Sequence, residues 1–98
     1  MIKIKIKKDS EKIKEVEIKG HALYDNYGKD IVCAAVSSIV ITTVNAIETV
    51  SSDSIKCDLE SFKITVLKDD EIVEKLLCNM INLLKELSLE YPKNIKFL

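Results

Sequence analysis

Apolar and charged residues alternate one by one along four stretches of the chain. Isoleucine and lysine alternate over residues 2–7, and apolar residues alternate with glutamate and lysine over residues 15–19. The same alternation returns over residues 55–60 and 62–66, on either side of a turn near Ser61. A period of two is typical of strands with one buried face, so the four stretches predict two β-hairpins.

Two longer segments have a helical pattern. Residues 71–90 carry apolar residues three or four positions apart, which predicts an amphipathic helix that ends before Pro92. The segment from Asp30 to about Val50 is rich in β-branched residues, which individually favour strands. Its length, and Asp30 as a good N-cap, nevertheless favour a buried helix.

The chain ends in a short apolar–polar alternation over residues 94–98, which predicts a fifth strand. The predicted order is therefore β-β-α-β-β-α-β. Hairpins combined with two long helices indicate the α+β class, here a two-layer sandwich with both helices on a mainly antiparallel sheet. A chain of 98 residues can bury one modest core, so residues 1–98 are expected to form a single domain.

Positive and negative charges are nearly balanced. The chain has 15 lysines and arginines against 16 acidic residues, for a formal net charge of −1. Nothing in this balance attracts the whole chain to nucleic acid or to an anionic membrane, so neither is expected as a direct partner. The lysines of residues 3–8 are interpreted first as the solvated face of a strand.

Cysteine content and hydropathy favour a cytoplasmic protein. Three cysteines without a Cys-x-x-Cys pair argue against a disulfide framework and for a reducing compartment. The N-terminus has no apolar run as long as a signal peptide needs. The longest uncharged segment, residues 31–47, is shorter than the roughly 20 apolar residues of a membrane span and is interrupted by serine, threonine and asparagine.

Residues 20–37 concentrate the chemically distinctive side chains. They include the only histidine, His21, and one of the three cysteines, Cys33. With Asp30 as the N-cap, Cys33 is the third residue of the predicted helix. Unpaired N–H groups and the partial positive charge of a helix start favour an anion, so a thiol there is biased toward the nucleophilic thiolate. His21 ends the preceding strand and could take the proton.

Two polar residues could support such a pair. Asp30 serves first as the helix cap; its carboxylate would disfavour a nearby thiolate, or it would orient His21. Ser37 lies one turn after Cys33. Its hydroxyl could reach the sulfur, or could bond to the backbone four residues earlier.

Each of these residues also has a plainer interpretation. A cysteine in an apolar helix is often a small buried hydrophobe, and a histidine at a strand end often lies on the surface. Gly20 and Gly28 are ordinary turn residues, although they could also let the loop between them open and close over a bound peptide. The spacing alone therefore leaves a Cys–His dyad open.

The other two thiols are weaker candidates. Cys57 falls on the apolar face of a strand, and Cys78 on the polar side of a helix without a histidine partner. Four scattered ligands without a close-spaced pair do not predict a zinc site. The chain also lacks a Gly-rich phosphate loop, so no metal or other cofactor is expected.

Two blocks of sequence resemble the ribosomal-processing cysteine protease (Prp) family. They are GHA at residues 20–22 and GKDIVCAAVS at residues 28–37. Residues 44–47 and 90–95 look like the family's as well, so the resemblance covers nearly the whole chain. It implies a single cysteine protease domain with His21 as the catalytic histidine and Cys33 as the nucleophile. It also implies that Asp30 and Ser37 are supporting polar residues.

The resemblance also implies what the enzyme acts on. Such a protein would be a cytoplasmic homodimer that trims the N-terminal extension from a large-subunit ribosomal protein. The peptide would carry bulky apolar residues before the cut, and a mobile loop between histidine and cysteine would cover the site. Residues 23–27, LYDNY, are bulkier than is common in the family, so the resemblance applies to the chemistry more directly than to loop motion and substrate preference.

Three other functions are compatible with the residues. The first is a non-catalytic module that binds a ribosomal protein or assists ribosome assembly. The second is a thiol redox or acyl-carrier type of enzyme, which would need Cys57 or Cys78 close to Cys33. The third is a nucleic-acid-binding domain that uses the lysine-faced strands, which the balanced charge disfavours.

Overall fold

The computed structural model describes residues 1–26, 29–58 and 61–98, and all statements below concern these residues. The order β-β-α-β-β-α-β is confirmed. In chain order the elements are β1 (Ile2–Asp9), β2 (Lys12–Lys19), α1 (Ile31–Val50), β3 (Ile55–Asp58), β4 (Lys63–Val66), α2 (Glu71–Glu90) and β5 (Ile95–Phe97).

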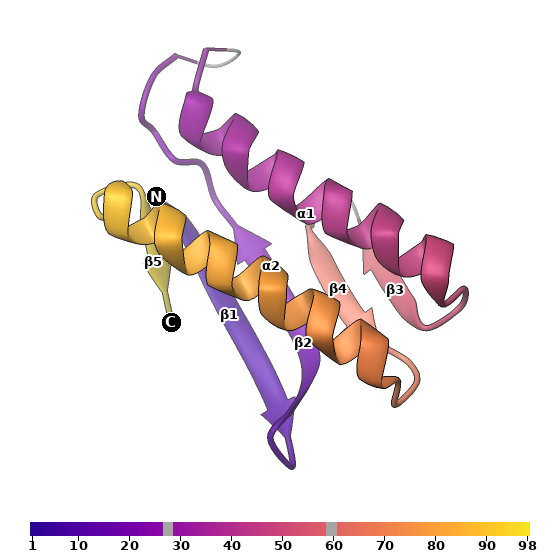
Figure 1. Cartoon of the computed structure of the whole chain (residues 1–98). Coiled ribbons are helices and arrows are strands. Elements are labelled where there is room, and N and C mark those ends of the chain that lie inside the picture. Colours follow the sequence, from indigo (N-terminus) through magenta and orange to yellow (C-terminus); the bar gives the residue numbers. More distant parts are fainter. Residues whose placement is uncertain (27–28, 59–60) are drawn as a thin grey trace.

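The five strands form one sheet in the order β3-β4-β2-β1-β5. Every neighbouring pair is antiparallel except β1 and β5, which run parallel. Both helices cross the same face of this sheet, with α2 over β1 and β2 and α1 over the side of β3 and β4 (Figure 1). The predicted α+β sandwich with a mainly antiparallel sheet is therefore confirmed.

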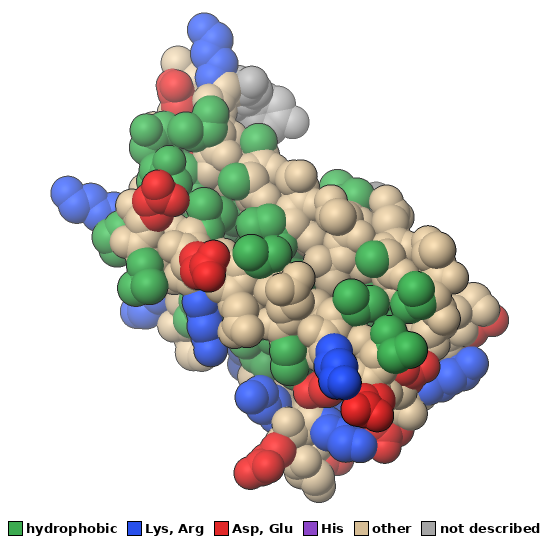
Figure 2. Space-filling view, in the orientation of Figure 1, with side chains coloured by type: hydrophobic (Ala, Val, Ile, Leu, Met, Phe, Trp, Pro, Cys, Tyr) green, Lys and Arg blue, Asp and Glu red, His purple; other side chains and the backbone are tan. Residues whose placement is uncertain are grey.

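The outer surface of the helix layer is only partly polar. Seen from this side, hydrophobic side chains lie over both helices among the charged ones, and charged side chains are densest at the end where α2 begins (Figure 2). The large exposed hydrophobic residues of the two helices are Ile31, Ile41 and Val50 on α1, and Ile72, Leu83 and Leu89 on α2.

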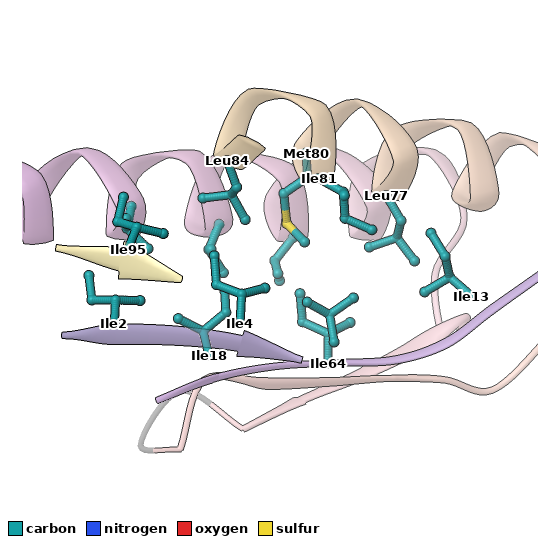
Figure 3. Packing of buried hydrophobic residues seen from close by; sticks show 14 of the residues in the cluster. Ile2, Ile4, Ile13, Ile18, Ile64, Leu77, Met80, Ile81, Leu84 and Ile95 are labelled. Carbon is teal, nitrogen blue, oxygen red and sulfur yellow. The ribbon is translucent and has the colours of Figure 1, made fainter. Parts of the chain in front are cut away.

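The core lies between the two layers. Side chains of α2 such as Leu77 and Met80 point toward the sheet, where Ile4 and Ile64 point back at them (Figure 3). All four are at most 1% exposed. Burial on both sides follows from the period of two in the strands and the three- to four-residue spacing in the helix.

Helix α1 contributes the other half of the helical layer. By length and composition alone, it is the one helix of the described chain that could cross a membrane, a test that the core helix of a soluble protein also passes. Its buried residues lie on one face, against α2 and the sheet, which is the packing expected of a core helix. They are Val32, Val36, Val40, Thr43, Val44 and Ile47.

Both helices begin at an aspartate. Asp30 accepts the N–H groups of Val32 and Cys33, as the sequence predicts, and Asp70 caps α2 in the same way. Ser51, at the end of α1, donates to the Asp70 carboxylate at 2.7 Å, which ties the end of one helix to the start of the next.

The second hairpin differs from its prediction. Phe62 was expected inside a strand, but it lies in the turn before β4 with φ of 46°. It is therefore not part of the alternating pattern of that strand. Its carbonyl oxygen accepts the N–H of Ile18, so the turn is tied to the end of β2. Leu59 and Glu60, also assigned to this hairpin, lie outside the described residues.

Candidate active site

The candidate site lies at the end of the sheet where β2 leaves it. Gly20, the residue after β2, has φ of +92°, and a Cβ at this position would overlap the carbonyl oxygen of Met1. Glycine is the residue that accepts both a positive φ and such a close backbone approach. Gly20 therefore allows the chain to turn away from the sheet immediately before His21.

This turn leads residues 21 and 22 toward the start of α1. The backbone N–H of Ala22 donates to the sulfur of Cys33 at 3.2 Å. Cys33 is the third residue of α1, as predicted, and is half-buried, whereas His21 is exposed. An N–H donor binds a charged sulfur more strongly than a neutral one, so this contact suits a thiolate.

Asp30 connects the loop to the helix. One carboxylate oxygen accepts the N–H groups of Val32 and Cys33, each at 3.0 Å, and the other accepts the N–H of Tyr24 at 3.0 Å. Burial by itself raises the pKa of Asp30, but the N–H donors of Cys33, Tyr24, Asp25 and Val32 outweigh it and hold that pKa below its usual value. The side chain is therefore a carboxylate at neutral pH.

This engagement affects two roles within the site. The bonds of Asp30 go to backbone N–H groups, and none between described residues joins it to His21. The N–H of Cys33, a natural first choice for binding an oxyanion, is already donated to Asp30.

Two hollows open at Cys33. The sheet-side hollow, of about 500 Å³, is lined by Ile2, Ile18, Lys19, Gly20, Val36, Ser61 and Phe62. The loop-side hollow, of about 520 Å³, is lined by Leu23, Asp25, Asp30 and Ala34. His21, Cys33 and Ser37 line both.

Ser37 and His21 both have free polar groups. Neither makes a side-chain hydrogen bond to another described residue, so the hydroxyl of Ser37 does not bond to the backbone of its own helix as Thr43 and Thr49 do. Both side chains border the hollows and are accessible to a ligand. Gly28, the second predicted hinge residue, lies outside the described residues.

The C-terminal segment contributes residues that the sequence patterns did not single out. The side-chain amide of Asn94 donates to the carbonyl oxygen of Ala22 at 2.8 Å. The rings of Tyr91 and Tyr24 meet edge to face, 5.4 Å apart. The only sequence signal for either contact was the family-like segment 90–95, because residues about 70 positions apart leave no trace in local spacing.

The other cysteines lack comparable surroundings. Burial raises the pKa of the half-buried Cys57 thiol, and the carboxylates of Glu48 and Asp58 raise it further. Cys78 is exposed on α2, near Glu74. All three thiols are free, and no group of three or more metal-binding side chains is assembled in the part of the chain that the structure describes.

A thiol in the first turn of a helix that lines two hollows together with a histidine is compatible with a cysteine peptidase. The chain belongs to the cysteine protease Prp family, whose family model matches residues 1–96. The resemblance noted in the sequence is thereby confirmed, and the protein is a peptidase of the ribosomal processing class.

Relatives and solved structures agree with this assignment. The ribosomal processing cysteine proteases Prp of Staphylococcus aureus strains Mu50 and NCTC 8325 are each 31% identical over 93 residues, which cover 90% of this chain and 88% of theirs. The crystal structure of an essential ribosomal processing protease Prp from S. aureus, with a covalently linked product peptide, has a TM-score of 0.88 at 31% identity, covering 99% of this chain and 97% of that one. A second S. aureus structure, with a substrate peptide, has a TM-score of 0.84 at 31% identity and covers 100% and 98%.

Proposed function

We propose that this chain removes the N-terminal extension of a large-subunit ribosomal protein, with Cys33 as the nucleophile and His21 as its base. The observation that carries the proposal is the position of the Cys33 sulfur. It lies in the first turn of α1, accepts the N–H of Ala22 at 3.2 Å and shares both hollows with His21. Among the three thiols, this is the one that lines a hollow together with the histidine.

The reaction is acyl transfer through sulfur. His21 takes the thiol proton, and the sulfur attacks the carbonyl carbon of the scissile bond. The resulting tetrahedral oxyanion collapses as His21 gives the proton to the leaving amine, which departs as the new N-terminus. His21 then draws a proton from water, which attacks the thioester carbonyl carbon. The C–S bond breaks, the acid product leaves, and protonated His21 returns its proton to the sulfur of Cys33.

The sheet-side hollow suits a bulky apolar side chain of the substrate. Ile2, Ile18, Val36 and Phe62 supply apolar walls, and Cys33 lines the same hollow. Burying apolar surface there contributes about 25 cal/mol per Å². This supports the expected preference for bulky apolar residues before the cut, and the S. aureus structures hold a product peptide and a substrate peptide.

Two polar residues have supporting roles in this proposal. Asp30 holds the loop and the helix start in register through its bonds to Tyr24 and Cys33. Ser37 borders both hollows and offers its hydroxyl to the backbone of the bound peptide. Gly20 provides the fixed turn before His21, and Gly28 is the second expected hinge of the loop.

The active form is proposed to be a cytoplasmic homodimer. The exposed apolar residues on the helix layer, such as Ile41 and Leu83, provide surface that a second copy can bury. Sedimentation equilibrium of the purified chain tests this state: a single species of monomer mass, at the concentration at which cleavage is measured, contradicts it.

A cleavage assay tests the function directly. The purified chain is mixed with the extended precursor of the ribosomal protein from the same organism, and product masses are read. We expect a single cut near the N-terminus by the native chain and by Cys78→Ala, but none by Cys33→Ala, Cys33→Ser or His21→Ala. Binding without cleavage by the native chain would instead identify a non-catalytic ribosomal-protein-binding module.

A further inference from the structure

We infer that Asn94 is a positioning residue for catalysis. Its side chain holds Ala22 in place, so that the Ala22 N–H can donate a hydrogen bond to the anion formed at Cys33. The inference rests on the proposed role of Cys33 as nucleophile. It assigns a function to the turn between α2 and β5, which is far from the His and Cys blocks in the sequence.

Asn94 is itself firmly placed. Its N–H donates to the carbonyl of Tyr91 at 3.0 Å, and its carbonyl accepts the N–H of Ile2 at 2.8 Å. These two bonds join the end of α2 to the start of β1. The half-buried side chain is then left to bond the loop, and its amide donates to the carbonyl of Ala22 at 2.8 Å.

Ala22 is consequently held on both sides. Its carbonyl is bound by Asn94, and its N–H points at the Cys33 sulfur at 3.2 Å. Its side chain is 1% exposed, so the residue is also packed into the core. The next residue, Leu23, has φ of 56°, a conformation that costs free energy in a non-glycine residue and persists only where surrounding contacts hold it. The Asn94 amide is one such contact.

The Ala22 N–H is a donor that no carboxylate occupies among the described residues. The N–H of Cys33 is occupied by the Asp30 carboxylate, which is held in place by two further N–H groups. In the resting site the Ala22 N–H donates to the sulfur. When the sulfur bonds to the substrate carbonyl carbon, the negative charge moves to the carbonyl oxygen, one bond further on. An N–H already directed at the sulfur can then donate to that oxygen.

Two variants of Asn94 test the inference. Asn94→Ala removes the donor, and Asn94→Asp keeps the shape while placing a carboxylate oxygen against the Ala22 carbonyl. We expect kcat for precursor cleavage to fall about tenfold to a hundredfold in both, with KM changed less than threefold, because the lost interaction belongs to the transition state. Asn82→Ala, an exposed asparagine of α2, is the matched control and should keep native kcat.

The rate of alkylation of Cys33 by iodoacetamide, read by peptide mass mapping, gives a second measurement. Both Asn94 variants should react severalfold more slowly than native, because the Ala22 N–H no longer stabilises the charged sulfur. This measurement is informative even if Asn94→Ala is partly unfolded, since unfolding speeds alkylation and so acts in the opposite direction. Thermal melting identifies such a case.

The outcomes separate this inference from the proposed function. Native kcat and native alkylation in both Asn94 variants would overturn the role of Asn94, while loss of cleavage in Cys33→Ala would still stand. Absence of cleavage by the native chain would instead remove the proposed function. A fall in kcat accompanied by an equal rise in KM would indicate a structural effect on peptide binding and would also contradict the inference.

Discussion

The carboxylate of Asp30 accepts the backbone N–H of Cys33 and that of Tyr24, each at 3.0 Å, with its two different oxygens. One side chain therefore caps the helix that bears the thiol and also holds the loop that follows His21. A cap normally stabilises a helix only. Here the same aspartate couples the position of the thiol to the position of the loop.

Replacing Asp30 separates these two contributions. In Asp30→Asn one oxygen can still cap Val32 and Cys33, but the amide nitrogen faces the N–H of Tyr24 and cannot accept it. We expect Asp30→Asn to melt within a few degrees of native while kcat/KM for precursor cleavage falls about tenfold or more, because a shift of the reacting groups by about 1 Å can cost up to roughly 10²-fold.

Asp30→Ala is the comparison variant, since it removes both the cap and the tether. It should be at least as slow as Asp30→Asn and should also melt at a clearly lower temperature. Native activity in Asp30→Asn would show that the bond to Tyr24 has no part in catalysis.

The backbone conformation of Gly20 determines the position of His21. Its φ of +92° and the overlap of any Cβ with Met1 both act against substitution, so Gly20→Ala should be less stable by about 2 kcal/mol or more in urea unfolding. Cleavage should also fall at temperatures where the variant is fully folded, because His21 is displaced. Lys14→Ala, an exposed residue earlier on β2, is the control and should keep the stability of the native chain.

The sequence predicted the parts of this protein that depend on local pattern. The start of α1 at Asp30, the position of Cys33 in its first turn and the span of α2 all follow from caps and periodicity, and the structure contains them. Local pattern failed at Phe62, where a left-handed backbone conformation delays the start of β4 to Lys63, one residue later than the alternation suggested. No pattern of β-branched or apolar residues encodes that conformation.

The contacts that complete the site are long-range and were not predictable in the same way. Asn94 meets Ala22 because β5 pairs in parallel with β1, and this pairing places the start of β5 next to the exit of β2. The engagement of the Cys33 N–H by Asp30 was missed for a different reason. The cap itself was expected, but its consequence for an oxyanion site appears only when the donors are counted.

Phe62 allows a test of the sheet-side hollow. Phe62→Ala removes one apolar wall, so KM for a precursor with bulky apolar residues before the cut should rise about tenfold while kcat changes little. Phe62→Leu retains most of the apolar surface and should stay within about threefold of native. A fall in kcat at unchanged KM in Phe62→Ala would place the apolar substrate residue elsewhere.

The link between Ser51 and Asp70 predicts how stability depends on pH. The hydrogen bond from Ser51 lowers the pKa of Asp70 below its usual 3.8, and the N–H groups of Val73 and Ile72 add to this effect against a smaller opposing effect of burial. Because the folded-state pKa is the lower one, the carboxylate stabilises the fold at pH values above the unfolded-state pKa. This contribution is lost as the pH falls through the folded-state pKa.

Urea unfolding at pH 7 and at pH 3 measures the contribution of Ser51. The native chain should be less stable at pH 3, where Asp30 and Asp69, whose pKa values are also lowered, act in the same direction. Ser51→Ala removes the largest cause of the Asp70 shift, so its loss of stability between pH 7 and pH 3 should be smaller than native. Ser52→Ala, an exposed neighbour, should lose as much as native. An equal loss in all three chains would mean that the Ser51 hydroxyl does not stabilise the ionised form of Asp70, and that α1 and α2 are held together by their apolar contacts alone.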